Sequence, residues 1–228
     1  MSRASALRAQ LAAEADEPGL ARLIAQNGAA AYPASIGAAQ CRNLIAEIEA
    51  PALRFSAERV WCEPWPEMTI AYKNLREAHF RAVPVTFEEM YAGAGPGSFL
   101  SEERVAFLLR RKPAKAWSVQ LPPSTDYKEQ TFSQPVPKSL PPGLYRVFAS
   151  SDGTFGEGGS PVFDEVFCVS RLALAVEPGR NGVKGYVLTA REGEPVAGAR
   201  VEVWTLDRKD SCKRSLTVTT GPDGSFAV

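Results

Sequence analysis

The chain has 228 residues, of which 45% are hydrophobic, and its 26 basic and 26 acidic side chains give a formal net charge of zero. An apolar share of this size fills a core, so we expect a globular chain of one or two domains. Neither charge sign gathers into a long block, so composition gives no electrostatic argument for nucleic acid or an anionic membrane as a partner. No apolar run approaches the roughly 20 residues that span a bilayer, and the N-terminus lacks the apolar core of an export signal.

Four cysteines are spread along the chain without a C-x-x-C pair: Cys41, Cys62, Cys168 and Cys212. Four cysteines allow three disulfide pairings, and the spacing selects none of them. We favour free, packed thiols, because an unpaired cysteine behaves as a small hydrophobe. With His79 as the single histidine, a zinc site would need mixed ligands from remote positions, so no metal site is predicted.

The first 50 residues are rich in alanine and carry apolar residues at helical spacing. The first stripe consists of Leu20, Leu23 and Ile24. The second stripe consists of Cys41, Leu44, Ile45 and Ile48. We expect Asn27-Gly28 to end the first helix, Ser35 to cap the second, and the second helix to end before Pro51. Two or three short amphipathic helices are therefore predicted, packed on each other, on the domain that follows, or on helices outside the given sequence.

After Pro51 the helical spacing gives way to alternating runs separated by Pro- and Gly-rich turns. Six strand-like runs lie at 53–56, 68–72, 79–83, 116–121, 144–148 and 163–167. Short strands punctuated in this way predict a β-sandwich. One interruption is helical, with Ser101 as its cap and Pro113 as its end.

Four more strands are predicted near the C-terminus, at 183–189, 199–206, 215–219 and 225–228. A complete sandwich of this type has about seven strands in about 100 residues, so this unit is expected to be incomplete. The missing strands would leave an apolar face and open sheet edges, which isolated proteins avoid. We therefore expect the sequence to be a fragment of a longer multidomain chain.

The predicted organisation has three parts. A helical lead covers residues 1–50, and a β-sandwich domain covers 51–172 with a helical insert near 101–112. The start of a second, truncated β-module covers 173–228.

Common catalytic signatures are missing, because the sequence contains no G-x-x-x-x-G-K-[ST], H-E-x-x-H or G-x-S-x-G. His79 lies in a strand-like stretch, and we interpret it as a surface or hydrogen-bonded sheet residue. A lysine or a carboxylate as catalytic base stays open. We predict no catalytic, cofactor-binding or metal-binding residue, no cofactor, no small-molecule substrate and no enzymatic activity.

Several other features have a structural interpretation. The glycine-rich loop 153–160 has strands on both sides, whereas a phosphate cradle needs a helix after it, so a hairpin loop is favoured. Asp152 and Glu157 fall short of the six to eight oxygen ligands of calcium. The basic run 110–115 is interpreted as a solvated helix end. Core or half-buried packing, in preference to a sugar-stacking platform, is expected of the four tryptophans, Trp61, Trp65, Trp117 and Trp204.

Two C-terminal segments carry a family resemblance: GEPVAGARVEV at 193–203 and TGPDGSF at 220–226. They are similar to the G-x-P-V-x-G-A-x-V and T-D-x-x-G-x-F pattern of macroglobulin-like and related immunoglobulin-like modules. Gly221-Pro222 departs from it, since the family usually has Asp soon after Thr, and carboxypeptidase-regulatory-like repeats share the motif. In physical terms, Gly198 allows a bend and Asp223-Gly224 supplies the positive φ of a tight hairpin.

Further segments upstream add to this resemblance: 72–75, 80–83, 117–122, 126–127, 140–145 and 169–174. From about residue 40 to the end, the chain resembles the N-terminal part of large bacterial alpha-2-macroglobulin-like proteins. The resemblance implies a mainly β fold: an immunoglobulin-like (macroglobulin-like) antiparallel β-sandwich with a short helical N-terminal lead and a second, incomplete sandwich module.

The same resemblance implies a parent protein that traps proteases at the bacterial cell envelope by collapsing around a protease that cleaves its bait segment. Some members add a thioester built on C-x-E-Q, but Tyr127 stands where Glu129-Gln130 would need the cysteine. The chain would then be a structural framework that inhibits no protease alone. Its partners would be neighbouring domains, with target proteases reached only through the full-length protein, and its location periplasmic, envelope-bound or extracellular.

Two other hypotheses remain open. The chain is alternatively an extracellular binding or adhesion module that recognises a glycan or a protein through its aromatic residues or the loop 153–160. A third hypothesis is an enzyme that uses paired Asp or Glu side chains in a pocket.

Overall fold

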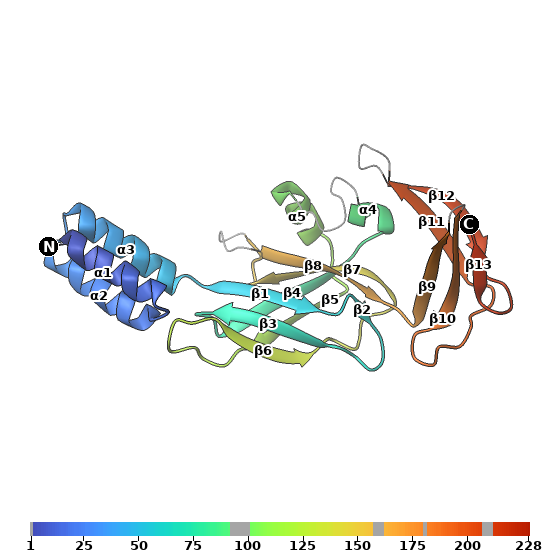
Figure 1. The fold of residues 1–228 in the computed structure, drawn as a ribbon, viewed down its shortest axis with the longest axis horizontal. Helices are drawn as coiled ribbons and strands as arrows, with labels where there is room; N and C mark the ends of the chain where they lie inside the picture. Colours follow the sequence, from blue (N-terminus) through green and yellow to red (C-terminus); the bar gives the residue numbers. More distant parts are fainter. Residues whose placement is uncertain (1, 92–100, 157–161, 180–181, 207–211) are drawn as a thin grey trace.

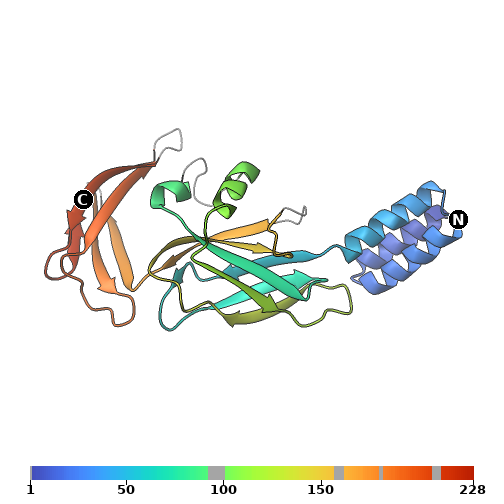
Figure 2. The same ribbon diagram turned by 180° about the vertical axis from the view of Figure 1, so that it is seen from behind.

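The structure, a computed structural model, describes residues 2–91, 101–156, 162–179, 182–206 and 212–228. Three parts follow one another along the long axis of the molecule (Figures 1 and 2). A bundle of three helices lies at one end, a β-sandwich lies in the middle, and a smaller β-unit, here called the third unit, lies at the other end. The fold is thus mainly β with a helical N-terminal segment, as the sequence predicted.

The helical bundle consists of α1 (Ser2–Glu14), α2 (Pro18–Ala31) and α3 (Ile36–Glu49). Its interior is built from small side chains, namely Ala6, Ala9, Ala21, Ala25 and Cys41. Small side chains allow the helix backbones to approach closely, which explains the alanine-rich composition. The predicted cap is confirmed, because the Ser35 hydroxyl accepts a hydrogen bond of 3.1 Å from the Ala38 N–H.

The predicted helix end at Asn27-Gly28 is wrong, because α2 continues to Ala31. A Cβ on Gly28 would lie 2.7 Å from the Ser5 Cβ and 3.1 Å from the Cys41 Sγ. Gly28 is therefore required where three helices meet, and its role is close packing rather than termination.

Side chains at the end of β3 (Glu67–Lys73) and in the turn after it attach the bundle to the sandwich. Asn74 donates a hydrogen bond of 2.8 Å to the Ile48 carbonyl, and the Lys73 ammonium donates one of 3.1 Å to the Glu47 carbonyl. These bonds satisfy carbonyls at the end of α3 that have no partner within the helix.

Two sheets form the sandwich. The three-stranded sheet has the order β1-β3-β6, and its other two strands are β1 (Ala52–Ala57) and β6 (Gln130–Pro135). The five-stranded sheet has the order β2-β8-β7-β4-β5, comprising β2 (Val60–Trp61), β4 (Glu77–Pro84), β5 (Lys115–Gln120), β7 (Gly143–Ser150) and β8 (Val162–Val169). Neighbouring strands are antiparallel except β2 and β8, which run parallel.

All six strands predicted for this region are present, whereas β2 and β6 were missed. Two residues are too few to show an alternating pattern, and the β6 sequence QTFSQP contains a single large apolar side chain. Pairing with β3 and β8, rather than local pattern, defines these two strands.

Aromatic rings fill the space between the two sheets. Phe55 of the smaller sheet contacts Phe80 and Phe167 of the larger one, with ring centroids 5.6 Å and 6.0 Å apart. Trp61 is fully buried, lies 4.6 Å from the Phe167 ring, and donates its indole N–H to the Glu58 carbonyl. The core therefore joins strands that are distant in the sequence.

A helical insert connects β4 to β5 and comprises α4 (Phe87–Tyr91) and α5 (Glu102–Leu109). The predicted helix near 101–112 corresponds to α5, and its Ser101 cap is confirmed by a hydrogen bond of 3.3 Å from the Arg104 N–H. The insert covers the outer face of the five-stranded sheet, where Leu108 packs with Val83 and Phe148. This sheet is consequently covered on its inner face and on the part of its outer face around Val83 and Phe148, whereas Ala116, Ser118 and Gln120 of β5 are exposed.

The third unit contains a sheet of order β13-β10-β9 and a two-stranded sheet, β11-β12. Its strands are β9 (Leu172–Gly179), β10 (Gly182–Thr189), β11 (Arg200–Leu206), β12 (Cys212–Thr219) and β13 (Ser225–Ala227). Four of them were predicted. β9 was missed because small alanines alternate with its larger apolar residues, so the sequence lacks the alternation of apolar and polar residues that predicts a strand.

The apolar face of the third unit is only partly covered. Leu174 and Val176 of β9 are 59% and 54% exposed, and Leu216 of β12 is 44% exposed. Leu174 and Val176 lie directly opposite Val187 and Gly185 of β10, on the side of that sheet that also carries Phe226. The exposed apolar face expected from the sequence is thus present in the structure.

We predict that Gly28→Ala destabilises the helical bundle. The clash with the Ser5 Cβ involves an atom next to the backbone, so relief requires the helices to separate. Overpacking of this kind costs about 1–3 kcal/mol, which outweighs the gain of about 1 kcal/mol in helix propensity. Thermal unfolding followed by the helical circular dichroism signal measures the effect. Gly19→Ala is the control, because a Cβ there meets nothing within 4 Å; equal melting of the two variants would contradict the packing role.

Candidate functional site

The described residues contain no group of three or more His, Cys, Asp or Glu side chains placed to hold a metal ion. Within the same residues, no helix combines the length and hydropathy that a membrane crossing requires. The polar and aromatic features that stand out lie instead at the junction, which we define as the place where the sandwich, the helical insert and the third unit meet (Figure 1).

A cleft of about 430 Å³ lies between the sandwich and the third unit. Its sandwich side is lined mainly by apolar side chains, those of Trp61, Trp65, Leu140, Pro142 and Val169. Its other side is formed by the segment 189–192, and Lys138 and Arg171 lie at the cleft as well. An ion pair of 3.3 Å between Arg191 and Glu63 crosses the cleft, with side chains that are 68% and 63% exposed.

The helical insert makes a separate contact with the third unit. The Phe87 ring of α4 lies 5.2 Å from the Trp204 ring of β11, measured between centroids. Both side chains are half-buried. An aromatic pair at this distance gains more than its buried area alone would give.

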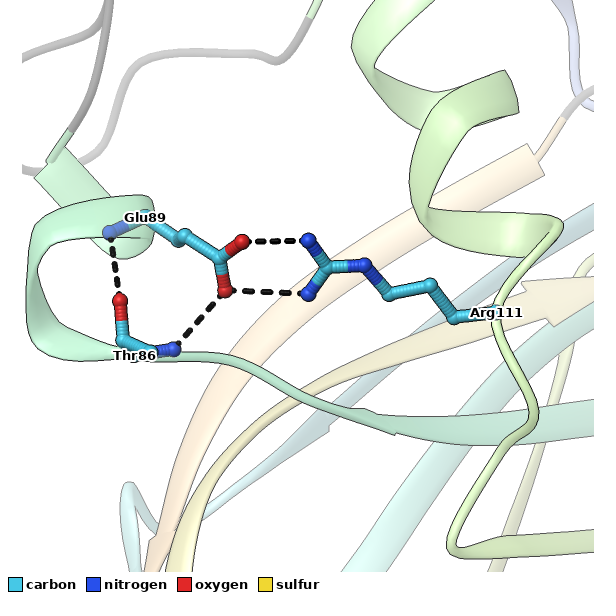
Figure 3. A network of polar contacts seen from close by, with 3 residues as sticks. All are labelled: Thr86, Glu89 and Arg111. Carbon is cyan, nitrogen blue, oxygen red and sulfur yellow. Dashed lines mark hydrogen bonds and ion pairs between the residues drawn. The ribbon is translucent and has the colours of Figure 1, made fainter.

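A polar network holds α4 in place (Figure 3). The Thr86 hydroxyl accepts a hydrogen bond of 3.2 Å from the Glu89 N–H, and the Thr86 N–H donates one of 3.1 Å to the Glu89 carboxylate. This is a reciprocal capping box at the start of the helix. The Glu89 carboxylate also accepts two parallel hydrogen bonds from the Arg111 guanidinium, one of them 3.0 Å long.

The electrostatics of this network follow from its geometry. The hydrogen bonds from Arg111 hold the pKa of Glu89 below its ordinary value, and Glu89 in turn raises the pKa of Arg111. Arg111 also lies 4.9 Å above the Phe107 ring. A planar guanidinium suits both contacts, which an ammonium would not reproduce. The carboxylate is thus committed to structure and is not placed as an acid or a base.

Among the other candidate residues, His79 lies beside Gly153 at the start of the glycine-rich loop, since a Cβ on Gly153 would be 3.8 Å from the His79 Nδ1. His79 lies half-buried in β4, with its Nε2 4.0 Å from a Glu77 carboxylate oxygen. The Asp152 carboxylate accepts a 2.7 Å hydrogen bond from the Thr154 N–H, so it forms a local turn. Glu157 lies outside the described residues. The loop that begins at Gly153 joins the antiparallel strands β7 and β8, as the hairpin interpretation predicted.

The four tryptophans do not form one platform. Trp61 and Trp65 line the cleft, although Trp61 is fully buried. Trp117 stacks on Phe80 with centroids 5.2 Å apart, and Trp204 packs against Phe87. Trp65 is therefore the half-buried tryptophan that a ligand in the cleft would meet.

The residues compared with a thioester motif, Tyr127 and Glu129-Gln130, make structural contacts. Glu129 accepts two hydrogen bonds, of 2.6 and 2.8 Å, from Arg54, and Gln130 begins β6. Tyr127 packs against the buried cluster that Ala12, Ala21 and Ile48 form in the helical bundle.

The basic run 110–115 is more than a solvated helix end, because Arg111 is bound by Glu89. Sequence reasoning missed this partner, although the Thr86-x-x-Glu89 spacing is that of a capping box. The Phe87–Trp204 contact has no comparable signal, since it joins residues more than a hundred positions apart in the sequence.

Three of the cysteines are free thiols, with Cys41 buried and Cys62 and Cys168 half-buried. Burial raises the pKa of the Cys168 thiol, which makes it less reactive. The side chain of Cys212 lies outside the described residues.

The C-terminal motif glycines adopt the predicted positive φ angles, but the tight hairpin predicted at Asp223-Gly224 is wrong, because β13 pairs with β10 whereas β12 pairs with β11. Gly198 and Gly224 have φ angles of +70° and +72°. The buried Thr220 hydroxyl accepts a 2.8 Å hydrogen bond from the Ala199 N–H and donates one of 2.6 Å to the Val196 carbonyl. The motif therefore ties the segment before β11 to the end of β12.

No family model matches the chain, and no curated protein matches it. Solved structures do match. A structure of native alpha-2-macroglobulin from Escherichia coli spanning domains MG0-NIE-MG1 matches with a TM-score of 0.56 at 12% identity, over 78% of this chain and 57% of the other. A structure of the same protein spanning domains NIE-MG1 matches with a TM-score of 0.56 at 12% identity, over 79% of this chain and 87% of the other.

This chain thus spans little more than half the length of the first of these structures. At this identity the likeness is one of fold, and it confirms the macroglobulin-like β-sandwich that the sequence predicted.

We predict that Glu89→Gln lowers stability at neutral pH and that the loss disappears in acid. Because the folded-state pKa of Glu89 is lowered, its contribution is present above its ordinary value of 4.5 and is lost as pH falls through the lowered value. The variant should be less stable by about 1 kcal/mol at neutral pH, a size suited to a partly exposed pair. Denaturant unfolding across pH measures the difference, with Glu103→Gln on the exposed side of α5 as control; a gap that persists in acid would contradict the assignment.

Proposed function

We propose that this chain is part of the structural framework of a bacterial alpha-2-macroglobulin-like, protease-trapping protein, and that it inhibits no protease by itself. The observation that carries the proposal is the fold match to the Escherichia coli alpha-2-macroglobulin domains, which extends over more than three quarters of the chain. The C-terminal motif, whose residues shape a turn between strands, supports the same conclusion.

The uncovered face of the third unit supports a framework role. Large apolar side chains on β9 and β12 are about half exposed. Exposed apolar surfaces of this kind mark places where another protein surface packs. In the proposed parent protein, neighbouring domains cover this face and are the direct partners of the chain.

The contacts of the described carboxylates also favour a structural role over a catalytic one. The carboxylates in the best-formed polar contacts, Glu89 and Asp164, are bound by arginines within the fold, Arg111 and Arg146. Proteases would be met by other parts of the parent protein. Its proposed location is the periplasm or the cell envelope.

Protease inhibition tests the proposal directly. The purified chain is mixed with a general protease such as elastase, and cleavage of a large protein substrate and of a small peptide substrate is measured. We expect no inhibition of either reaction at any ratio, because a framework part has nothing with which to enclose a protease. Selective protection of the large substrate, which indicates enclosure, would refute the claim that this chain inhibits nothing alone.

A second candidate function is recognition of a glycan or a protein in the cleft, and the position of Trp65 favours it. A half-buried indole beside an apolar wall is suited to stacking against a sugar ring or an apolar side chain. A glycan array should then detect micromolar binding that Trp65→Ala abolishes. Trp117→Phe is the matched control, because Trp117 stacks on Phe80 and does not line the cleft. Equal binding by both variants would exclude the cleft.

A further inference from the structure

The third unit follows the sandwich with almost no connecting chain, because β8 ends at Val169 and β9 begins at Leu172. Backbone hydrogen bonds flank this link, from the Ser170 N–H to the Trp61 carbonyl at 3.2 Å and from the Ala190 N–H to the Arg171 carbonyl at 2.8 Å. A short link of this kind limits the separation of the two units but leaves rotation about the link free. The angle between them must therefore be set by contacts to either side.

We propose that the helical insert is a strut that fixes the angle between the sandwich and the third unit, with Phe87 as its contact residue and the Glu89–Arg111 pair as its positioning element. The proposal rests on the geometry of the junction and does not depend on the proposed function.

The α5 part of the strut is firmly attached to the sandwich. Leu108 of α5 is 2% exposed and packs on Val83 and Phe148 of the five-stranded sheet. The Val85 N–H donates a hydrogen bond of 3.0 Å to the Leu144 carbonyl, which continues the pairing of β4 with β7 up to the start of the insert. Burial of apolar side chains on the sheet makes α5 a fixed base.

The position of α4, the part of the strut that contacts the third unit, depends on polar contacts instead. α4 has five residues, and a helix of that length is not stable on its own. The capping box at Thr86 sets its first turn, and the two-pronged contact between Glu89 and Arg111 ties it to the end of α5 (Figure 3). Two parallel hydrogen bonds fix direction as well as distance, so the side of α4 that carries Phe87 is held toward Trp204.

A second contact between described side chains of the two units is weak by comparison. The Arg191–Glu63 pair is about two-thirds exposed on both sides, and exposed pairs contribute little to stability. The Phe87–Trp204 contact is apolar and half-buried, so it is favourable without regard to salt. In this arrangement the strut also fixes the width of the cleft, since the two walls of the cleft belong to the two units.

Backbone ¹⁵N relaxation of the full chain tests the proposal. In the unaltered chain the amides of the sandwich and of the third unit should share one rotational correlation time. Trp204→Ala and Phe87→Ala should each lower the correlation time of the third unit below that of the sandwich, while the chemical shifts of both units stay native. Glu89→Gln should weaken the coupling less, because glutamine keeps the capping box but loses half of the two-pronged contact.

Two matched controls separate the strut from other contacts. Arg191→Ala removes the exposed ion pair, and Tyr32→Ala removes an exposed aromatic ring at the end of α2 in the helical bundle, away from the junction. Both variants should keep the common correlation time. If Trp204→Ala changes the chemical shifts of β11, the test of the proposal rests on Phe87→Ala alone, because that substitution leaves the sequence of the third unit unaltered. Independent tumbling in the unaltered chain, or common tumbling in Phe87→Ala, would overturn the proposal.

Discussion

A β-sheet with an apolar face is stable only when a second layer covers that face, and this constraint organises the β-rich part of the molecule. In the sandwich, the rings of Phe55, Phe80 and Phe167 meet between the two sheets and exclude water from both inner faces. The outer face of the larger sheet is also apolar in part, and the helical insert covers it through Leu108. In the third unit, β9 keeps large apolar side chains exposed, so the same constraint is not met within the described residues.

This difference between the two β-units explains why a framework role fits the chain. The sandwich is closed by its own residues, and its carboxylates of lowered pKa or buried position serve the fold, as with Glu89 and Asp164. The third unit offers a surface that gains stability when another protein layer packs on it. A protein built in this way contributes rigidity and attachment, which is the framework role that we propose for this chain.

The junction adds a second level of organisation, because it brings together elements that belong to different parts of the chain. The insert leaves the sandwich between β4 and β5 and reaches β11 of the third unit through the aromatic contact of Phe87 with Trp204. A short helix has little stability of its own, so its position follows from the side chains that bind it, those of Thr86 and Arg111. The width of the cleft, and with it any recognition at Trp65, then depends on the same few residues.

The sequence by itself determined the elements whose stability is local. Alternation along 68–72 and 79–83, the Ser35 and Ser101 caps, and the positive φ at Gly198 and Gly224 all follow from residue type and spacing. It also indicated the fold, because the C-terminal motif encodes a turn that occurs in a particular kind of module.

Only the tertiary structure decided the features that depend on distant partners. Gly28 resembled a helix end, but its role comes from Ser5 and Cys41 on other helices. β6 has little strand character alone and exists because β3 pairs with it. The basic run 110–115 suggested a solvated helix end, but Arg111 in it is bound by Glu89. No local sequence pattern links Phe87 to Trp204. Spacing along a chain specifies which face a residue occupies, whereas packing specifies what that face meets.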